Sequence, residues 1–265
     1  MPRTRWTVCA GIALLATAIA TAASPGDAAA GEILVAAAAS LRESAVLIAD
    51  TYEATRPGSR ALLTFGASSA LAAQIRAGAP VDVFLSADPR IVQQLVDLGL
   101  VADGDSFRFA GNRLVVIRAS DRALEISGPR DLLRPEVRLI AISGRAVPVG
   151  RYARAWLESV GLDGAFEERV ALTEHARASL AAVELGHADL AIVYATDALA
   201  ARSAVVAYAI PDSEQPAIAY AAARIADSSH AEDAGAFLAH LRSDAVRAIL
   251  SEAGFEAAAS EGRAP

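Results

Sequence analysis

A strand and a helix meet in the stretch Ile33-Leu34-Val35-Ala36-Ala37-Ala38-Ala39-Ser40-Leu41-Arg42-Glu43, near the start of the chain. The apolar run before Ser40 predicts a buried strand, and apolar residues at helical spacing follow it through Tyr52. Ser40 and Glu43 match the Ser-x-x-Glu capping box, so Ser40 alone is explained as a helix cap. A helix start also offers free N–H groups to an anion, and a hydroxyl can accept from an amide while it donates to a ligand.

The alternation of strand and helix continues along the whole chain. Strand-like runs lie at 61–65, 81–85, 114–117, 137–142, 190–193, 205–209 and 218–222. Helical patterns begin near 40, 68, 88, 152, 173, 232 and 244, with Thr173 as an expected cap. This order predicts an α/β fold with mostly parallel sheets, whose ligands bind beyond the carboxyl ends of the strands. Ser40, Ser68 and Tyr194 each follow a predicted strand and are therefore candidates for one site.

Residues 1–30 are predicted to be a secretory signal peptide. Arg3 and Arg5 precede an apolar stretch, and small residues at Ala23 or Ala30 offer cleavage sites. The alternative is a membrane anchor, but the apolar run is shorter than the ~20 residues that a span needs. The single cysteine of the chain, Cys9, falls within this segment.

The charge of the remaining chain argues against nucleic acid as a partner. From Gly31 onward there are 22 arginines and 30 acidic residues, which are the 24 and 31 of the whole chain less Arg3, Arg5 and Asp27. The formal net charge of this part is −8, and the chain has no lysine. Nucleic-acid binding needs a basic surface. Affinity for any anion must come from local dipoles and hydrogen bonds, because distant charges are screened beyond ~8 Å.

A second serine motif, Gly66-Ala67-Ser68-Ser69-Ala70, raises the possibility of catalysis. It is similar to the Gly-x-Ser-x-Gly nucleophile elbow, but Ala70 stands where that motif has glycine. An elbow also needs a histidine and an acid as partners. The histidines show no metal-like spacing and are interpreted as surface or cap residues: His175, His187, His230 and His240.

Further motifs stand along the chain in a fixed order: Ala37-Ala38-Ala39-Ser40-Leu41, Phe65-Gly66-Ala67-Ser68-Ser69, Gly78-Ala79-Pro80-Val81-Asp82-Val83-Phe84-Leu85-Ser86-Ala87-Asp88, Gly111-Asn112-Arg113-Leu114-Val115-Val116 and Ile192-Val193-Tyr194. Together they resemble the periplasmic molybdate-binding proteins of molybdate ABC transporters. The resemblance extends from Ile33 to Phe255, and its most specific part is the block that ends at Asp88.

The resemblance implies a two-lobed, type II periplasmic-binding-protein fold with the ligand in the cleft. Lobe one would comprise residues 31–109 and 216–265, and lobe two residues 110–215. The implied function is high-affinity binding of molybdate, and of tungstate, in the periplasm. The protein would be a monomer that delivers the anion to the membrane permease of an ABC transporter, with no catalytic activity and no cofactor.

The same resemblance implies the ligand-binding residues. The two serine hydroxyls of the family correspond to Ser40 and Ser68, its two backbone N–H donors to Val149 and Ala176, and its tyrosine hydroxyl to Tyr194. Molybdenum would be held as an oxyanion, with no protein atom bonded to the metal.

Two departures from the family pattern bear on the cavity. The stretch 143–147 lacks the usual Asn-Pro or Asp-Pro turn, and Val149 and Ala176 replace other apolar residues. Backbone donors tolerate such changes, whereas the shape of the cavity depends on them. Arg145, near this turn, is expected on the surface, with the cleft as the alternative.

Other functions remain open at the level of sequence. The ligand of a binding protein could be sulfate, phosphate or an organic anion. A serine hydrolase that uses Ser68 and a ligand-sensing module are the alternatives from other classes. Molybdate and sulfate share charge and shape but differ in size, so the dimensions of the cavity must separate them.

Overall fold

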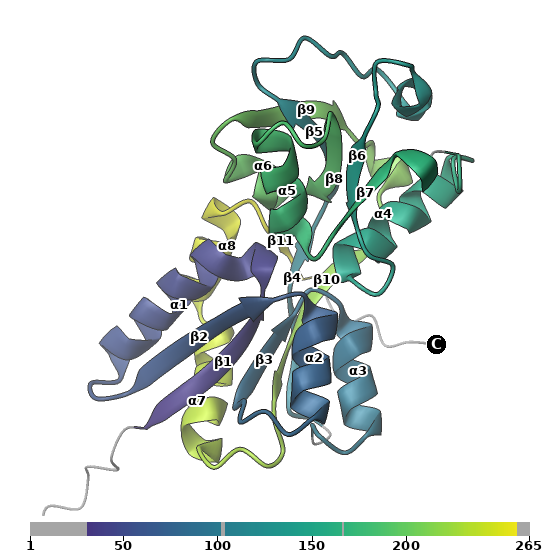
Figure 1. Ribbon diagram of the computed structural model, residues 1–265. Helices are drawn as coiled ribbons and strands as arrows, with labels where there is room; N and C mark the ends of the chain where they lie inside the picture. Colours follow the sequence, from purple (N-terminus) through teal and green to yellow (C-terminus); the bar gives the residue numbers. More distant parts are fainter. Residues whose placement is uncertain (1–30, 102–103, 166, 259–265) are drawn as a thin grey trace, which may run out of the picture.

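Two β-sheets, each covered by helices, make up the protein in the computed structural model, which describes residues 31–101, 104–165 and 167–258 (Figure 1). We call the larger sheet with its helices lobe one and the smaller sheet with its helices lobe two. Lobe one carries both the purple-blue and the yellow ends of the colour scale, because the first and last segments of the chain share it. The predicted signal peptide, 1–30, lies outside the described residues.

Lobe one contains a six-stranded sheet of order β11-β4-β10-β3-β1-β2. Its strands are β1 (Glu32–Ala38), β2 (Arg60–Gly66), β3 (Val83–Ser86), β4 (Ser106–Asn112), β10 (Ile218–Arg224) and β11 (Glu256–Ala257). Its helices are η1 (Ala39–Leu41), α1 (Arg42–Thr55), α2 (Ser68–Arg76), α3 (Pro89–Asp97), α7 (Ala231–Leu241) and α8 (Asp244–Glu252).

Lobe two contains a five-stranded sheet of order β7-β6-β8-β5-β9. Its strands are β5 (Leu114–Ala119), β6 (Ile140–Ser143), β7 (Val170–Thr173), β8 (Leu190–Tyr194) and β9 (Ala204–Ala209). Its helices are α4 (Pro148–Ser159), α5 (Ala176–Glu184) and α6 (Ala195–Leu199), with short 3-10 turns η2 (Pro129–Leu133), η3 (Glu167–Arg169) and η4 (Asp212–Glu214).

Both sheets are mixed, which corrects the expectation of mostly parallel sheets. In lobe one β1 pairs in parallel with β2 and β3, whereas β10 is antiparallel to β3 and β4. In lobe two β6 pairs in parallel with β7 and β8, whereas β5 is antiparallel to β8 and β9. The antiparallel strands β4, β5, β9 and β10 flank the two places where the chain passes between the sheets. Strand β5 follows the first crossing and β10 follows the second, and each is antiparallel to both of its neighbours in the sheet that it joins.

A hydrophobic core that continues from one lobe to the other positions the strand ends. Residues of β1, α1, α7 and β10 share one buried cluster with residues of β5, β6, α4 and β8. Two further clusters lie under α2 and α3 in lobe one and under α5 in lobe two. Trp156 of α4 and Tyr220 of β10 are among the largest fully buried side chains. The lobes therefore meet through packed side chains beside the carboxyl ends of β1, β3 and β8.

Local signals fix the helix starts only in part. Asp88 caps α3 as predicted, because its carboxylate accepts from the Arg90 amide at 3.0 Å and Pro89 follows. Helix α4 begins at Pro148, four residues before the predicted start, because proline suits the first helical position. The prediction that Thr173 caps the next helix is wrong. Thr173 ends β7, and His175 caps α5 through its Nδ1 atom, which accepts from the Ala178 amide at 3.1 Å.

Several short elements were not predicted from the sequence. They are strands β4, β7 and β11 and helix α6, and β6 is shorter than its predicted range of 137–142. Strand β4 runs through Asn112, so lobe-one pairing extends beyond residue 109. Among the described residues, no helix is both long and apolar enough to cross a membrane.

Candidate anion-binding site

All of the residues predicted to bind the ligand line one cavity between the lobes. Ser40 and Ser68 reach it from lobe one, and Val149, Ala176 and Tyr194 reach it from lobe two. Each is buried, with 5% exposure or less. The other lining residues are small, apolar or uncharged at this position: Ala38, Ala39, Gly66, Ala67, Ala87, Val147, Pro148 and His175. The fold thus brings together residues that lie up to 154 positions apart, between Ser40 and Tyr194.

The cavity is small. The centre of a water molecule can reach about 20 Å³ of it, where one water needs ~10–15 Å³. Two larger hollows, of about 760 and 640 Å³, lie elsewhere on the described surface and are lined by arginines and aromatic residues. Size alone would favour the larger hollows as binding sites, but neither is lined by any of the residues that the sequence predicts to bind the ligand. The small cavity suits a compact ligand of a few atoms.

Helix N-termini from both lobes converge on this cavity, and the first turns of two of them have no side-chain cap. The residues before α2 and α4 are Ala67 and Val147, which have no side-chain acceptor. The first N–H groups of a helix have no partner within the helix, and the dipole makes this end positive. Since polar side chains do not occupy them, the amides at the start of α2 and α4 remain available to an anion.

Ser40 is not a helix cap, which corrects the capping-box interpretation. It lies within η1, and neither η1 nor α1 begins with a side-chain cap. Its Oγ atom instead lies 2.9 Å from the hydroxyl of Tyr220 on β10. Glu43, the other half of the expected box, forms an ion pair with Arg177 of lobe two. The Ser40 hydroxyl therefore does not cap a helix, and it lines the cavity instead.

The proton of Ser40 is oriented by a chain of hydrogen bonds. The Asn112 side-chain oxygen accepts from the Arg113 amide at 2.8 Å, which fixes the amide orientation of Asn112. Its Nδ2 atom then donates to the Tyr220 hydroxyl at 3.3 Å. Either hydroxyl of the 2.9 Å contact between Tyr220 and Ser40 could donate, but the Tyr220 proton has a partner only if it points to Ser40, so this direction is favoured. Burial raises the pKa of Tyr220, which keeps it a neutral donor. Because the Ser40 oxygen accepts from Tyr220 in this arrangement, its own proton can be donated to a ligand in the cavity.

The Ser68 hydroxyl is also an acceptor within the protein, so its proton too can be donated to a ligand. The first residue of α2, it is 1% exposed, and its Oγ atom accepts from the Ala87 amide at 3.0 Å. Its proton is therefore free to point at a ligand. Ala87 follows β3, so this contact also links two strand ends of lobe one.

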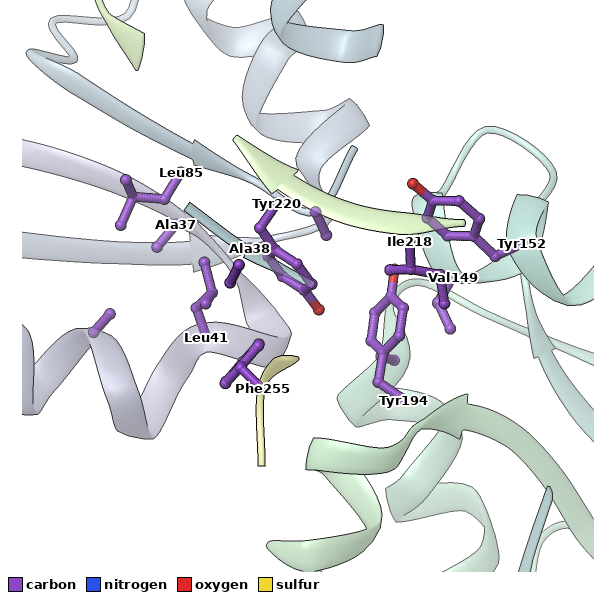
Figure 2. Packing of buried hydrophobic residues seen from close by; sticks show 14 of the residues in the cluster. Ala37, Ala38, Leu41, Leu85, Val149, Tyr152, Tyr194, Ile218, Tyr220 and Phe255 are labelled. Atoms are coloured by element: carbon purple, nitrogen blue, oxygen red, sulfur yellow. The ribbon is translucent and has the colours of Figure 1, made fainter. Parts of the chain in front are cut away.

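Tyr194 carries the clearest sign of a missing partner. Its hydroxyl is buried and has no hydrogen-bond partner among the described residues. Figure 2 shows its ring beside that of Tyr220, and the ring centroids are 5.8 Å apart. Burial raises the pKa of Tyr194 well above its usual value, so the group stays protonated. A buried hydroxyl without a partner costs about 1–3 kcal/mol, and a ligand that accepts its proton removes that cost.

No arginine or acidic side chain lines the cavity among the described residues. Its one titratable imidazole, His175, uses Nδ1 to cap α5, and burial lowers its pKa. Both effects favour the neutral imidazole. The site therefore offers hydroxyl and amide dipoles rather than a cation, a donor set that suits an anion held reversibly.

The structure also bears on three other hypotheses from the sequence: the location of Arg145, metal binding and catalysis by Ser68. Arg145 lies on the surface, 67% exposed, and pairs with Glu167 at 2.7 Å. In the described part of the chain, no group of three or more His, Cys, Asp or Glu side chains is arranged to hold a metal ion. The described hydrogen bond of Ser68 is with the Ala87 amide, and the nearby imidazole of His175 is engaged by Ala178. No activating base is therefore seen at Ser68 among the described contacts.

Three residues that orient the site were not found by sequence reasoning. Asn112 and Tyr220 set the Ser40 proton, and Ala87 sets that of Ser68. Asn112 and Ala87 stand inside the motifs quoted above, but their spacing gives no hint of these contacts. The signal for Tyr220 is a hydroxyl within the apolar run Ile218–Ala223 of β10.

Comparison with known proteins identifies the family. The family model described as bacterial extracellular solute-binding protein matches residues 33–256. The molybdate-binding protein ModA of Mycobacterium tuberculosis is 32% identical over 224 residues, which cover 84% of each chain. ModA of Escherichia coli is 32% identical over 230 residues, covering 85% of this chain and 89% of that protein.

Solved structures agree on the fold. A substrate-binding domain of a putative molybdenum ABC transporter from Clostridium difficile is 28% identical, with a TM-score of 0.67, and covers 87% of this chain and 100% of that one. The periplasmic molybdate-binding protein of Azotobacter vinelandii has a TM-score of 0.75 at 24% identity, covering 84% and 98%. These matches confirm the two-lobed fold class predicted from the sequence. The chain belongs to the bacterial extracellular solute-binding proteins, as a relative of the ModA proteins.

Proposed function

We propose that this protein binds molybdate, and tungstate as its near equivalent, with high affinity and without catalysing a reaction. The observation that carries the proposal is the convergence of buried, uncharged donors from both lobes on one small cavity. Ser40, Ser68 and Tyr194 would donate through hydroxyls, and Val149 and Ala176 through backbone N–H groups. The relatives named ModA support molybdate as the anion.

The energetics are consistent with tight binding. A dianion that enters the cavity loses hydration, which the donors must replace. Hydrogen bonds to a charged group contribute roughly 1.5–3 kcal/mol each, so several together can reach micromolar to nanomolar affinity after the costs of binding. Because the donors are neutral, selection between molybdate and the smaller sulfate would depend on cavity size.

The family membership supports a proposal for the cellular role. We propose export to the periplasm by the signal peptide at 1–30 and delivery of the anion, as a monomer, to the permease of an ABC transporter. Lobe one would comprise residues 31–112 with 216–265, and lobe two residues 113–215, because β4 extends past the predicted boundary at 109; the cavity lies between them. Closure of the lobes would bury the ligand, and opening at the permease would release it.

Removing either serine hydroxyl tests the site. Ser40→Ala and Ser68→Ala should each weaken molybdate binding by about 10-fold or more, since each deletes one hydrogen bond to a charged ligand. Isothermal titration calorimetry on the purified proteins measures this. Ser69→Ala is the matched control, because Ser69 is adjacent but does not line the cavity. Wild-type affinity in both cavity variants would contradict the site.

The choice of anion is tested by thermal unfolding with molybdate, tungstate, sulfate and phosphate. Molybdate and tungstate should raise the melting temperature, because a ligand that binds only the folded state stabilises it. Stabilisation by sulfate but not by molybdate would overturn the ligand assignment.

Tyr194→Phe should lower the affinity for molybdate without lowering the stability of the ligand-free protein. Without ligand, the unfolding free energy should stay unchanged or rise by up to ~1 kcal/mol, because the variant removes a buried hydroxyl that lacks a partner. Molybdate affinity should fall by ~10-fold, because a donor is lost. Chemical denaturation and calorimetry measure the two quantities. A clear loss of ligand-free stability would mean that the hydroxyl has a partner within the protein.

A further inference from the structure

Helices α4 and α5 of lobe two each place an arginine just after the residue whose amide lines the cavity. Arg151 follows Val149 by two positions, and Arg177 follows Ala176 directly. Both arginines reach across to a carboxylate of lobe one. The two ion pairs thus join the lobes on the elements that carry the lobe-two donors.

The pair between Arg151 and Asp88 is the more buried one. Arg151 donates to the Asp88 carboxylate at 2.6 Å, and the side chains are 31% and 4% exposed. Asp88 follows Ala87, the residue that orients Ser68, and its other carboxylate oxygen caps α3. Burial raises the pKa of Asp88, and the bonds from Arg90 oppose that rise. A guanidinium at 2.6 Å adds a charge-assisted hydrogen bond that favours the carboxylate.

The pair between Arg177 and Glu43 is more open to solvent. The side chain of Glu43 on α1 is 56% exposed and that of Arg177 is 17% exposed. Arg177 also lies 2.9 Å from Asp197 of lobe two, which is fully buried. Exposed pairs typically contribute little, whereas loss of one partner from a buried pair has a large effect. Of these two ion pairs, Arg151–Asp88 should therefore be the stronger.

We propose that Arg151–Asp88, with Arg177–Glu43 in a lesser part, is a closure latch that holds the lobe-two amides against the bound anion. The inference rests on the proposed function. These arginines do not line the cavity, so they act as positioning residues and not as ligands. Opening the lobes must break both pairs, which makes the latch a determinant of how fast the anion leaves.

The two partners of the stronger pair allow a sharp test. Asp88→Asn keeps the α3 cap, because asparagine caps as well as aspartate, and removes the ion pair. Arg151→Met removes the same pair and leaves the carboxylate. Through-space charge acts oppositely in the two variants: loss of Asp88 should favour a bound anion, and loss of Arg151 should disfavour it. A latch predicts that both variants release molybdate faster.

Stopped-flow measurement of molybdate dissociation distinguishes these outcomes. Both variants should raise the dissociation rate by ~10-fold or more, with a smaller change in the association rate, since interface changes act mostly on dissociation. Glu43→Gln should raise it by only ~2-fold, and added salt should reduce that difference. Arg151→Lys should recover part of the slow release. Arg145→Met is the matched control, because its pair with Glu167 lies within lobe two. Faster release in Arg151→Met with unchanged or slower release in Asp88→Asn would overturn the latch.

A readout without molybdate keeps this test separate from that of the proposed function. The chain after residue 30 has no cysteine, so Leu47→Cys and Leu185→Cys, both exposed, can carry spin labels on the two lobes. Distance distributions should extend to longer values in Asp88→Asn and Arg151→Met than in the parent or in Arg145→Met. Unchanged distributions in both variants would overturn the latch even if molybdate binds. Absence of molybdate binding to the wild type, with the shift in distances present, would defeat only the proposed function.

Discussion

Gly150→Ala should abolish most of the molybdate affinity and also destabilise the protein. A Cβ atom at Gly150 would lie 2.1 Å from the Ser143 carbonyl oxygen and 2.4 Å from that of Gly144. Both neighbours are backbone atoms at the end of β6, so the start of α4 must move. We expect a loss of about 3 kcal/mol of unfolding free energy, the upper range for an overpacked site. Affinity should fall by ~100-fold, because the Val149 amide moves with the helix.

Gly144→Ala is the matched control for this prediction. It adds the same methyl group to the same turn, where the nearest atom is a Val147 methyl carbon at an ordinary 3.9 Å. Chemical denaturation and calorimetry on both variants separate crowding from a general effect of alanine. Equal stability and affinity in Gly150→Ala and Gly144→Ala would show that the close approach of α4 to β6 is not required.

Arg177→Met should cause a loss of stability that depends on pH. Asp197 is 0% exposed, and burial raises its pKa to about 7 in spite of Arg177. The Arg177 Nε atom is 2.9 Å from the carboxylate, but neither it nor Asp197 Oδ1 makes a well-aligned hydrogen bond among the described contacts. The interaction is therefore mainly between charges. Without it, the buried carboxyl must take up a proton, which at pH 8 costs about 1.4 kcal/mol for a group whose pKa in the intact protein is about 7.

The sign of the pH effect follows from the raised pKa of Asp197. An acid whose pKa is higher in the folded than in the unfolded state binds more protons when folded, so its contribution to stability falls as pH rises between about 4 and 7. Loss of Arg177 raises that pKa further. The destabilisation should thus be largest at pH 8 and smaller at pH 6, as measured by denaturation at both values.

The double variant Arg177→Met/Asp197→Asn provides the control. It removes the buried charge together with its partner, so much of the stability at pH 8 should return. If the single and double variants are equally unstable at pH 8, the loss comes from packing rather than from the uncompensated carboxylate.

Sequence reasoning succeeded where the signal is local. The apolar run before Ser40, the Asp88-Pro89 helix start and the strand that ends at Tyr194 are encoded by neighbouring residues, and the structure has all of them. It failed where distant residues compete for the same atom. The Ser-x-x-Glu pattern at Ser40 did not form a cap, because Tyr220 holds the serine and Arg177 holds Glu43.

The sequence by itself determined the alternation of strands and helices, the family motifs and the identity of the residues that line the cavity. Only the tertiary structure decided how those residues act. The proton that Ser40 can donate depends on Asn112 and Tyr220. The lack of a partner for the Tyr194 hydroxyl among the described residues depends on burial from both lobes, and the contact of Arg151 with Asp88 depends on the two lobes lying side by side. Hydrogen-bond direction, desolvation and ion pairing depend on which atoms meet in space, and residues far apart in the chain supply those atoms.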